Sequence, residues 1–225
     1  MRRRHSLLPM VHDFEWTAPA LRVGGLVPFT TIDYPGHLAA VIFCQGCPWR
    51  CGYCHNTHLL ARHSDREISW AAVMDLLRRR RGLLDAVVFS GGEPTLQAAL
   101  PAAIGAVKDM GYKVGLHTAG IYPRRFAQVL PLLDWVGFDV KAPVADYETI
   151  TRAAHSAKRA HASLELLLES GVAHVIRTTV DRRVLTQDKL DALGAELARL
   201  GVTRHVLQAC RALPAVANAP QRDRA

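Results

Sequence analysis

Short apolar runs alternate with longer helical patterns along most of this chain of 225 residues, and this alternation constrains the fold more than any other feature. The apolar runs are rich in Val, Ile and Phe and are short enough to be buried strands. They cover residues 39–43, 86–89, 113–117, 135–140, 174–180 and 205–208. Helical patterns separate them at 69–81, 96–110, 123–132, 145–171 and 186–200, and we expect the fourth of these helices to be broken.

Strands that alternate with helices predict parallel βα units joined by right-handed crossovers. A closed eight-unit barrel takes about 250 residues, so six units predict either a partial barrel or an open doubly wound sheet. Functional side chains gather at the C-terminal ends of the strands in both folds. We divide the chain into an irregular segment over 1–20, a single domain over 21–210 and a loose tail over 211–225.

The composition is close to the average of globular proteins, with 49% hydrophobic and 21% charged residues, and it excludes a disordered chain, a collagen and a coiled coil. No apolar stretch approaches the roughly 20 residues of a membrane helix. No secretory signal is visible, so we expect a cytoplasmic protein without a membrane partner. The net charge of +8 is spread along the chain apart from two arginine runs, so a nucleic-acid partner is not favoured.

Four of the five cysteines fall within residues 44–54. Such crowding in a reducing compartment indicates a metal site and not disulfides. Cys47, Cys51 and Cys54 have the spacing C-x3-C-x2-C directly after the first predicted strand. Three thiolates on a cubane [4Fe–4S] cluster leave one iron open for a substrate. We interpret Cys44 as a small apolar core residue.

A zinc site is the alternative interpretation of this cysteine loop, with His55 or a distant residue as the fourth ligand. Zinc motifs usually contain two pairs of ligands, and the sequence has no second pair. His55 directly follows Cys54 and is badly placed to bind the same ion. Cys44 and Cys210 rank low as a fourth ligand of a cluster, so the three-cysteine cluster is favoured.

The cysteine loop resembles the signature of the radical S-adenosylmethionine (SAM) superfamily, which has an aromatic residue, here Tyr53, before the third cysteine. More narrowly, the chain resembles the activating enzymes of glycyl radical enzymes, and among them the anaerobic ribonucleoside-triphosphate reductase activating proteins. Residues 24–36, 45–47 and 53–56 carry this resemblance. The stretch Thr-Ile-Asp-Tyr-Pro-Gly over 31–36 is its most specific part.

The resemblance implies a radical SAM partial (β/α)6 barrel whose cofactors are a [4Fe–4S] cluster, held by Cys47, Cys51 and Cys54, and SAM. The reduced cluster would cleave SAM, and the resulting 5′-deoxyadenosyl radical would take hydrogen from a backbone glycine. The implied protein substrate is a glycyl radical enzyme such as anaerobic ribonucleotide reductase. An electron donor such as flavodoxin or ferredoxin is the second implied partner. No catalytic residue beyond the cluster and SAM is expected.

Further motifs follow the second and third predicted strands. Gly91, Gly92 and Glu93 alone would be a strand-to-helix turn, but they resemble the family segment that binds the ammonium group of SAM. Many activating enzymes have Asp-Thr-Asn-Gly where this chain has His117-Thr118-Ala119-Gly120. We expect Thr118 to form a hydrogen bond in the SAM site, and we expect Tyr53 to line the same site. We interpret His117 as a strand-end histidine with a backbone partner.

Charged residues follow or interrupt the next two predicted strands. Asp139 and Lys141 point to one face because they lie two residues apart on a strand, and they form either a salt bridge or part of the SAM site. The resemblance implies that Lys141 binds the SAM carboxylate. Arg177 is a charge in an apolar strand and needs a partner. That partner is either SAM or a structural carboxylate.

Two other functions stay open at the level of sequence. One is a radical SAM enzyme that acts on a small molecule, such as a carboxydeazaguanine synthase, although such an enzyme has no reason to carry the 31–36 stretch. The other is a non-enzymatic module that binds metal or nucleic acid. Strands that end in cofactor-like motifs argue against this module.

Overall fold

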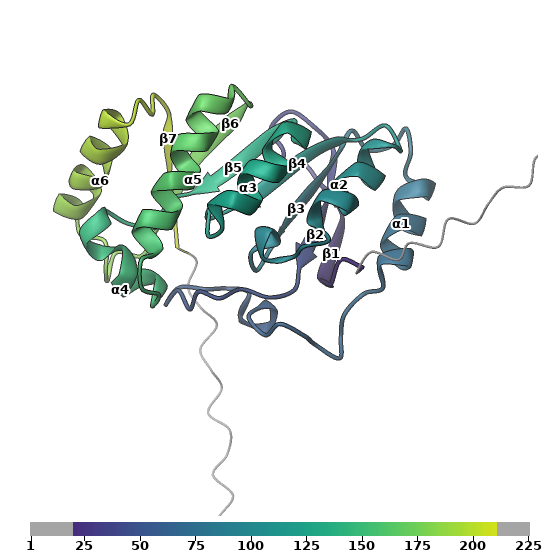
Figure 1. Ribbon diagram of the computed structural model, residues 1–225, viewed down its shortest axis with the longest axis horizontal. Coiled ribbons are helices and arrows are strands. Elements are labelled where there is room, and N and C mark those ends of the chain that lie inside the picture. The colour runs from purple at the N-terminus through teal and green to yellow at the C-terminus, as the bar shows by residue number, and fades with distance from the viewer. Residues whose placement is uncertain (1–19, 211–225) are drawn as a thin grey trace, which may run out of the picture.

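Seven strands form one sheet and lie side by side in chain order from β1 to β7. The computed structural model of the chain describes residues 20–210 (Figure 1). The strands are β1 (Val23–Thr30), β2 (Ala39–Cys44), β3 (Ala86–Gly91), β4 (Lys113–Thr118), β5 (Trp135–Asp139), β6 (His174–Val180) and β7 (His205–Ala209). Strand β1 is antiparallel to β2, whereas β2 to β7 are all parallel.

The six predicted strands are confirmed as β2 to β7. A doubly wound sheet would contain a point where the strand order reverses, and this sheet has none. The fold is therefore the partial barrel. Strand β1 was not predicted, because Gly24, Gly25 and Pro28 are residue types depleted from strands. An edge strand tolerates them, and β1 pairs only with β2.

Helices connect the parallel strands, and Figure 1 shows the main ones on one face of the sheet. The α-helices are α1 (Trp70–Arg79), α2 (Leu100–Lys108), α3 (Pro123–Val129), α4 (Tyr147–Thr151), α5 (Ser156–Ser170) and α6 (Gln187–Arg199). Single 3-10 turns are η1 (Thr57–Leu59), η2 (Pro94–Leu96), η3 (Leu130–Leu132) and η4 (Val144–Asp146).

Two of the predicted helices differ in detail from the structure. The helix expected from residue 96 begins at Leu100, because Pro101 is accepted only in the first turn of a helix. The predicted break in the 145–171 helix is confirmed between α4 and α5. Arg152 and His155 have φ values of 53° and 58° there, which no α-helix accommodates.

The sheet separates two apolar clusters. Alternate side chains such as Ile42, Phe89 and Leu116 are fully buried in the main core. Their neighbours face the other way, and a smaller cluster there includes Val41, Val88, Tyr34 and Trp135. The rings of Tyr34 and Trp135 lie 5.2 Å apart. Tyr34 of the 31–36 stretch thus packs against the concave face of the sheet.

The predicted tail at 211–225 lies outside the described residues, and so does the predicted segment at 1–20 except for its last residue. Within residues 20–210, no helix combines the length and apolar character that crossing a bilayer requires.

Candidate functional site

A cavity of about 240 Å³ opens at the C-terminal ends of strands β2 to β6. It forms there because the ends of parallel strands meet at one edge of the sheet. All the site residues predicted from the sequence line it: Cys47, Cys51, Tyr53, Cys54, Gly91, Gly92, Glu93, Thr118, Asp139, Lys141 and Arg177. The structure therefore brings the cysteine loop and the four strand-end motifs together.

The cysteine loop follows β2, and backbone hydrogen bonds hold it on both sides. The Gly46 amide donates to the Leu59 carbonyl at 2.8 Å, and the Arg50 amide donates to the Thr151 carbonyl at 2.9 Å. The Arg50 guanidinium donates to the Cys47 carbonyl at 2.7 Å. Cys44, at the end of β2, is fully buried in the core as predicted. The loop is therefore held in place by contacts that involve no disulfide among the described residues.

The three cysteines of the C-x3-C-x2-C motif line the same cavity. In the described part of the chain, no three His, Cys, Asp or Glu side chains converge on a position for one metal ion. The thiolates around one zinc ion share a single tetrahedron, whereas a cubane takes each thiolate on a different iron. Burial raises the pKa of Cys47 to about 12 and also raises the pKa of Cys51.

Gly91 and Gly92 make room for the cysteine loop. A Cβ at Gly91 would lie 2.5 Å from the Cys44 amide nitrogen, and one at Gly92 would lie 2.3 Å from the Gly46 carbonyl oxygen. Gly91 also has a φ of 114°, which side chains rarely accept. Two successive glycines let another group approach the backbone closely. The structure adds that the backbone of the cysteine loop makes such an approach.

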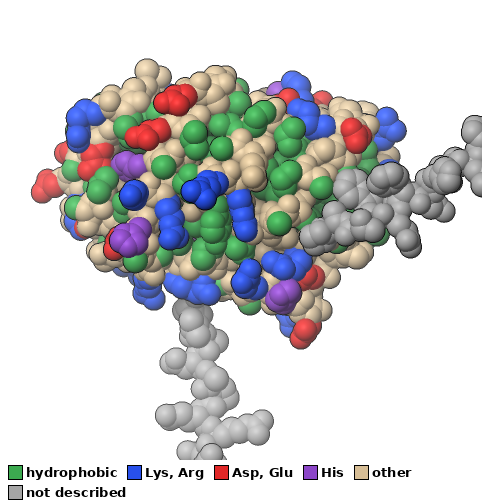
Figure 2. Space-filling view, in the orientation of Figure 1, with side chains coloured by type: hydrophobic (Ala, Val, Ile, Leu, Met, Phe, Trp, Pro, Cys, Tyr) green, Lys and Arg blue, Asp and Glu red, His purple; other side chains and the backbone are tan. Residues whose placement is uncertain are grey.

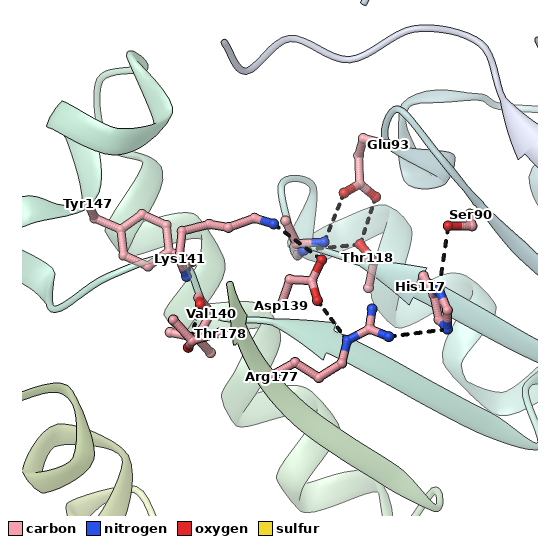
Figure 3. A network of polar contacts seen from close by, with 12 residues as sticks. Ser90, Glu93, His117, Thr118, Asp139, Val140, Lys141, Tyr147, Arg177 and Thr178 are labelled. Carbon is pink, nitrogen blue, oxygen red and sulfur yellow. Dashed lines mark hydrogen bonds and ion pairs between the residues drawn. The ribbon is translucent and has the colours of Figure 1, made fainter. Parts of the chain in front are cut away.

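Glu93 joins the ends of β3 and β4 through its carboxylate (Figure 3). It is 1% exposed and accepts hydrogen bonds from the amide and the hydroxyl of Thr95 at 3.1 and 2.6 Å. It also accepts from the Thr118 hydroxyl at 2.7 Å and from the Ala119 amide at 3.1 Å. Burial raises the pKa of Glu93 above its ordinary value, although the four donors act in the opposite direction. The carboxylate is thus fully bonded within the protein.

Asp139, Lys141 and Arg177 form one ion cluster (Figure 3). The two oxygens of Asp139 accept from Arg177 Nε at 2.8 Å and from Lys141 Nζ at 3.2 Å. Burial raises the pKa of Asp139, but Lys141 and Arg177 outweigh it and hold that pKa well below its ordinary value. The partner of Arg177 is therefore a structural carboxylate, that of Asp139. The three side chains carry one surplus positive charge, which suits an anionic ligand group.

His117 has the backbone partner that the sequence predicted, and the partner lies in the 31–36 stretch. Its Nε2 is 2.9 Å from the Asp33 carbonyl oxygen, which only accepts, and 3.4 Å from a guanidinium nitrogen of Arg177, which only donates. The shorter contact assigns the proton to Nε2. The Ser90 hydroxyl then donates to Nδ1 at 3.4 Å. Burial and the neighbouring Arg177 lower the pKa of His117 to about 4. The imidazole is therefore neutral near pH 7.

Several residues that line the cavity were missed at the level of sequence, among them Trp49, Ser90 and Thr179. Thr179 lies two residues after Arg177 on β6, so the strand period was a signal that could have found it. Trp49 lies inside the cysteine loop and could have been considered on that ground alone.

Comparison with known proteins decides the family. The sequence profile of the radical SAM superfamily matches residues 41–193, which include the cysteine loop and the ends of β3 to β6. The chain belongs to the radical SAM superfamily. This radical SAM protein is an enzyme, and its cofactors are a [4Fe–4S] cluster and SAM.

Two curated relatives of the radical SAM enzyme have informative names. A Methanocaldococcus jannaschii protein named as a glycyl-radical enzyme activating enzyme is 30% identical over 179 residues, which cover 75% of this chain and 72% of the relative. The pyruvate formate-lyase-activating enzyme of Clostridium pasteurianum is 31% identical over 136 residues, which cover 58% of this chain and 57% of the relative. The chain thus spans little more than half of the second relative.

Among solved structures, the radical SAM enzyme resembles anSMEcpe with bound AdoMet. The TM-score is 0.61 at 16% identity, and the match covers 74% of this chain and 49% of the other. This likeness shows that the two chains share the fold.

Proposed function

We propose that this radical SAM enzyme generates a glycyl radical on a partner enzyme, and that the partner is an anaerobic ribonucleotide reductase. The observation that carries the proposal is the position of the 31–36 stretch. Its Asp33 carbonyl contacts His117, which lines the candidate site, and its Tyr34 packs inside the concave face. The stretch typical of activating enzymes therefore lies against a residue of the site wall. The names of the curated relatives, a glycyl-radical enzyme activating enzyme and a pyruvate formate-lyase-activating enzyme, support the generation of a glycyl radical on a partner.

Cys47, Cys51 and Cys54 hold the [4Fe–4S] cluster in this proposal. Their sulfurs come from one loop, line one cavity and are not arranged around a single ion. When bound and reduced, the cluster supplies the electron that cleaves SAM. An electron donor such as flavodoxin or ferredoxin completes the proposal.

The strand ends bind SAM in this proposal. Lys141 and Arg177 attract the SAM carboxylate through the surplus positive charge of their cluster with Asp139. The turn over Gly91, Gly92 and Glu93 faces the SAM ammonium group with backbone carbonyls. Because four protein donors already occupy the Glu93 carboxylate, its part is to hold this turn against Thr118. Tyr53 lies beside Lys141, whose Nζ is 5.9 Å from the ring centre.

The exposed surface of the enzyme has features that suit a protein substrate. Four large apolar side chains within residues 27–38 are exposed: Val27, Phe29, Ile32 and Leu38, at 37%, 53%, 80% and 40%. Apolar side chains gathered on a surface mark binding sites for other proteins. Figure 2 shows Lys and Arg side chains gathered over the lower half of one face, which suits an acidic partner.

The decisive experiment is anaerobic incubation of the reconstituted enzyme with reductant, SAM and a candidate glycyl radical enzyme. We expect the doublet of a glycyl radical on the partner by electron paramagnetic resonance. The matched control replaces the acceptor glycine of the partner by alanine, which removes the doublet. Turnover of a small molecule without a radical on any candidate partner would contradict the proposal. A radical on a different glycyl radical enzyme would contradict only the choice of ribonucleotide reductase.

A further inference from the structure

The cysteine loop contains two of the four buried side-chain polar atoms that lack a hydrogen-bond partner among the described residues. They are Trp49 Nε1 and Tyr53 Oη. A buried donor without an acceptor costs about 1–3 kcal/mol, so such groups are rare and call for a specific explanation. A tyrosine hydroxyl both donates and accepts, but an indole N–H only donates. Trp49 therefore needs an acceptor.

The position of Trp49 limits what that acceptor is. It lies two residues from Cys47 and two from Cys51, lines the same cavity as both, and is 2% exposed. Its ring packs edge-on against Tyr147, with the ring centres 5.9 Å apart. The Arg50 guanidinium donates to the carbonyl oxygens of Cys47 and Trp49 at 2.7 and 2.9 Å. These contacts fix the indole within the cysteine loop.

Sulfur is the acceptor that this loop can supply. A thiol is a weak acceptor, whereas a metal-bound thiolate or sulfide carries negative charge and accepts much more strongly. Binding of a cluster would therefore turn an unfavourable buried N–H into a bonded one. Tyr53 Oη is the other polar group of the loop that lines the cavity, and it does not accept from the indole, because both atoms lack a partner. The remaining polar side chains of the cavity follow the loop at residues 55–56 or come from the ends of β3 to β6.

We propose that the Trp49 indole N–H donates a hydrogen bond to a sulfur of the [4Fe–4S] cluster on its Cys47–Cys51 side and thereby raises the reduction potential of the cluster. This inference rests on the cluster proposed above. Reduction adds one negative charge to the cluster, so a donor at sulfur stabilises the reduced form more than the oxidised form. Trp49 is then a positioning and tuning residue outside the ligand set.

The first test compares Trp49→Phe with the unchanged protein in the absence of SAM. Phenylalanine keeps a ring against Tyr147 but removes the N–H. We expect the same iron and sulfide content and a midpoint potential shifted to more negative values. Trp70→Phe is the matched control, because Trp70 lies at the start of α1 and outside the cavity lining. It should leave the potential unchanged. A Trp49→Phe cluster with the original potential would overturn the inference.

The second test uses the unchanged protein and so does not depend on the stability of a variant. With ¹⁵N in the indole of tryptophan, pulsed electron paramagnetic resonance of the reduced cluster should detect coupling to one indole nitrogen. Trp70→Phe should keep this coupling. Its absence, or its appearance only after SAM is added, would overturn the inference. A purified protein that binds no iron would instead contradict the proposed cluster, and a missing glycyl radical would bear only on the proposed activity.

Discussion

His117 Nε2 lies 2.9 Å from the backbone carbonyl oxygen of Asp33, although 84 residues separate the two along the chain. His117 is the last residue but one of β4, and Asp33 belongs to the 31–36 stretch. The hydrogen bond holds the stretch beside the polar wall of the cavity. The ring of Tyr34 also packs against the ring of Trp135 and so holds the stretch against the sheet. The 31–36 stretch is therefore held next to the candidate site by His117.

The protonation of His117 gives the first prediction. Its pKa is about 4 in the folded state, below an ordinary value of 6.5. The unfolded chain therefore binds this proton first, so folding stability should fall as the pH drops from about 6.5 towards 4. The loss is up to about 3 kcal/mol. Urea unfolding at several pH values should show this dependence in the unchanged protein and a weaker one in His117→Asn. Equal slopes for both proteins would contradict the assignment.

The three cysteines proposed as cluster ligands give the second prediction. Ala in place of Cys47, Cys51 or Cys54 should abolish the cluster, because each thiolate binds its own iron. Iron and sulfide analysis of anaerobically reconstituted protein measures this loss. Cys44→Ala and Cys210→Ala are the matched controls and should keep the iron. If Cys210→Ala loses the iron instead, the cluster has a fourth protein ligand and no open iron.

Glu93 gives the third prediction. Glu93→Ala leaves the donors of Thr95, Thr118 and Ala119 without their acceptor, so the turn proposed to bind SAM should loosen. We expect SAM affinity to fall about tenfold or more, which corresponds to 1.4 kcal/mol or more, while the cluster iron is retained. Equilibrium binding of SAM to the reconstituted protein is the measurement.

Asp134→Asn is the control for Glu93→Ala. Its carboxylate also joins strands, by accepting from the Val114 amide at 2.7 Å, but it lies outside the cavity lining. SAM affinity should be unchanged in this control. If Glu93→Ala also binds SAM as the unchanged protein does, SAM does not use this turn.

Ile32 gives the fourth prediction. It is 80% exposed and directly precedes Asp33, so Ile32→Asp should disturb a protein partner without unfolding the chain. We expect a several-fold lower initial rate of glycyl radical formation with unchanged SAM affinity. Leu207→Asp, on β7 at the opposite edge of the sheet, is the control, at 52% exposure. Equal rates for Ile32→Asp and the unchanged enzyme would exclude this surface from partner binding.

The sequence predicted the parallel strands because their apolar, β-branched residues have the pattern of buried strands. It also predicted that the motifs after those strands meet, since parallel strands end at one edge. It could not predict β1, because Gly24, Gly25 and Pro28 are residue types that strands usually lack. Nor could it predict which backbone group His117 bonds, because that partner depends on how a distant loop crosses the concave face.

The strand order carries a consequence for synthesis of the chain. Each strand from β2 onwards pairs with the strand made just before it, so the sheet can extend from its N-terminal edge while the ribosome is still at work. The cysteine loop emerges early, between β2 and β3, whereas Arg177 arrives with β6 and completes the ion cluster with Asp139. A nascent chain would therefore display its metal-binding thiols well before the walls that shield them from oxygen are in place.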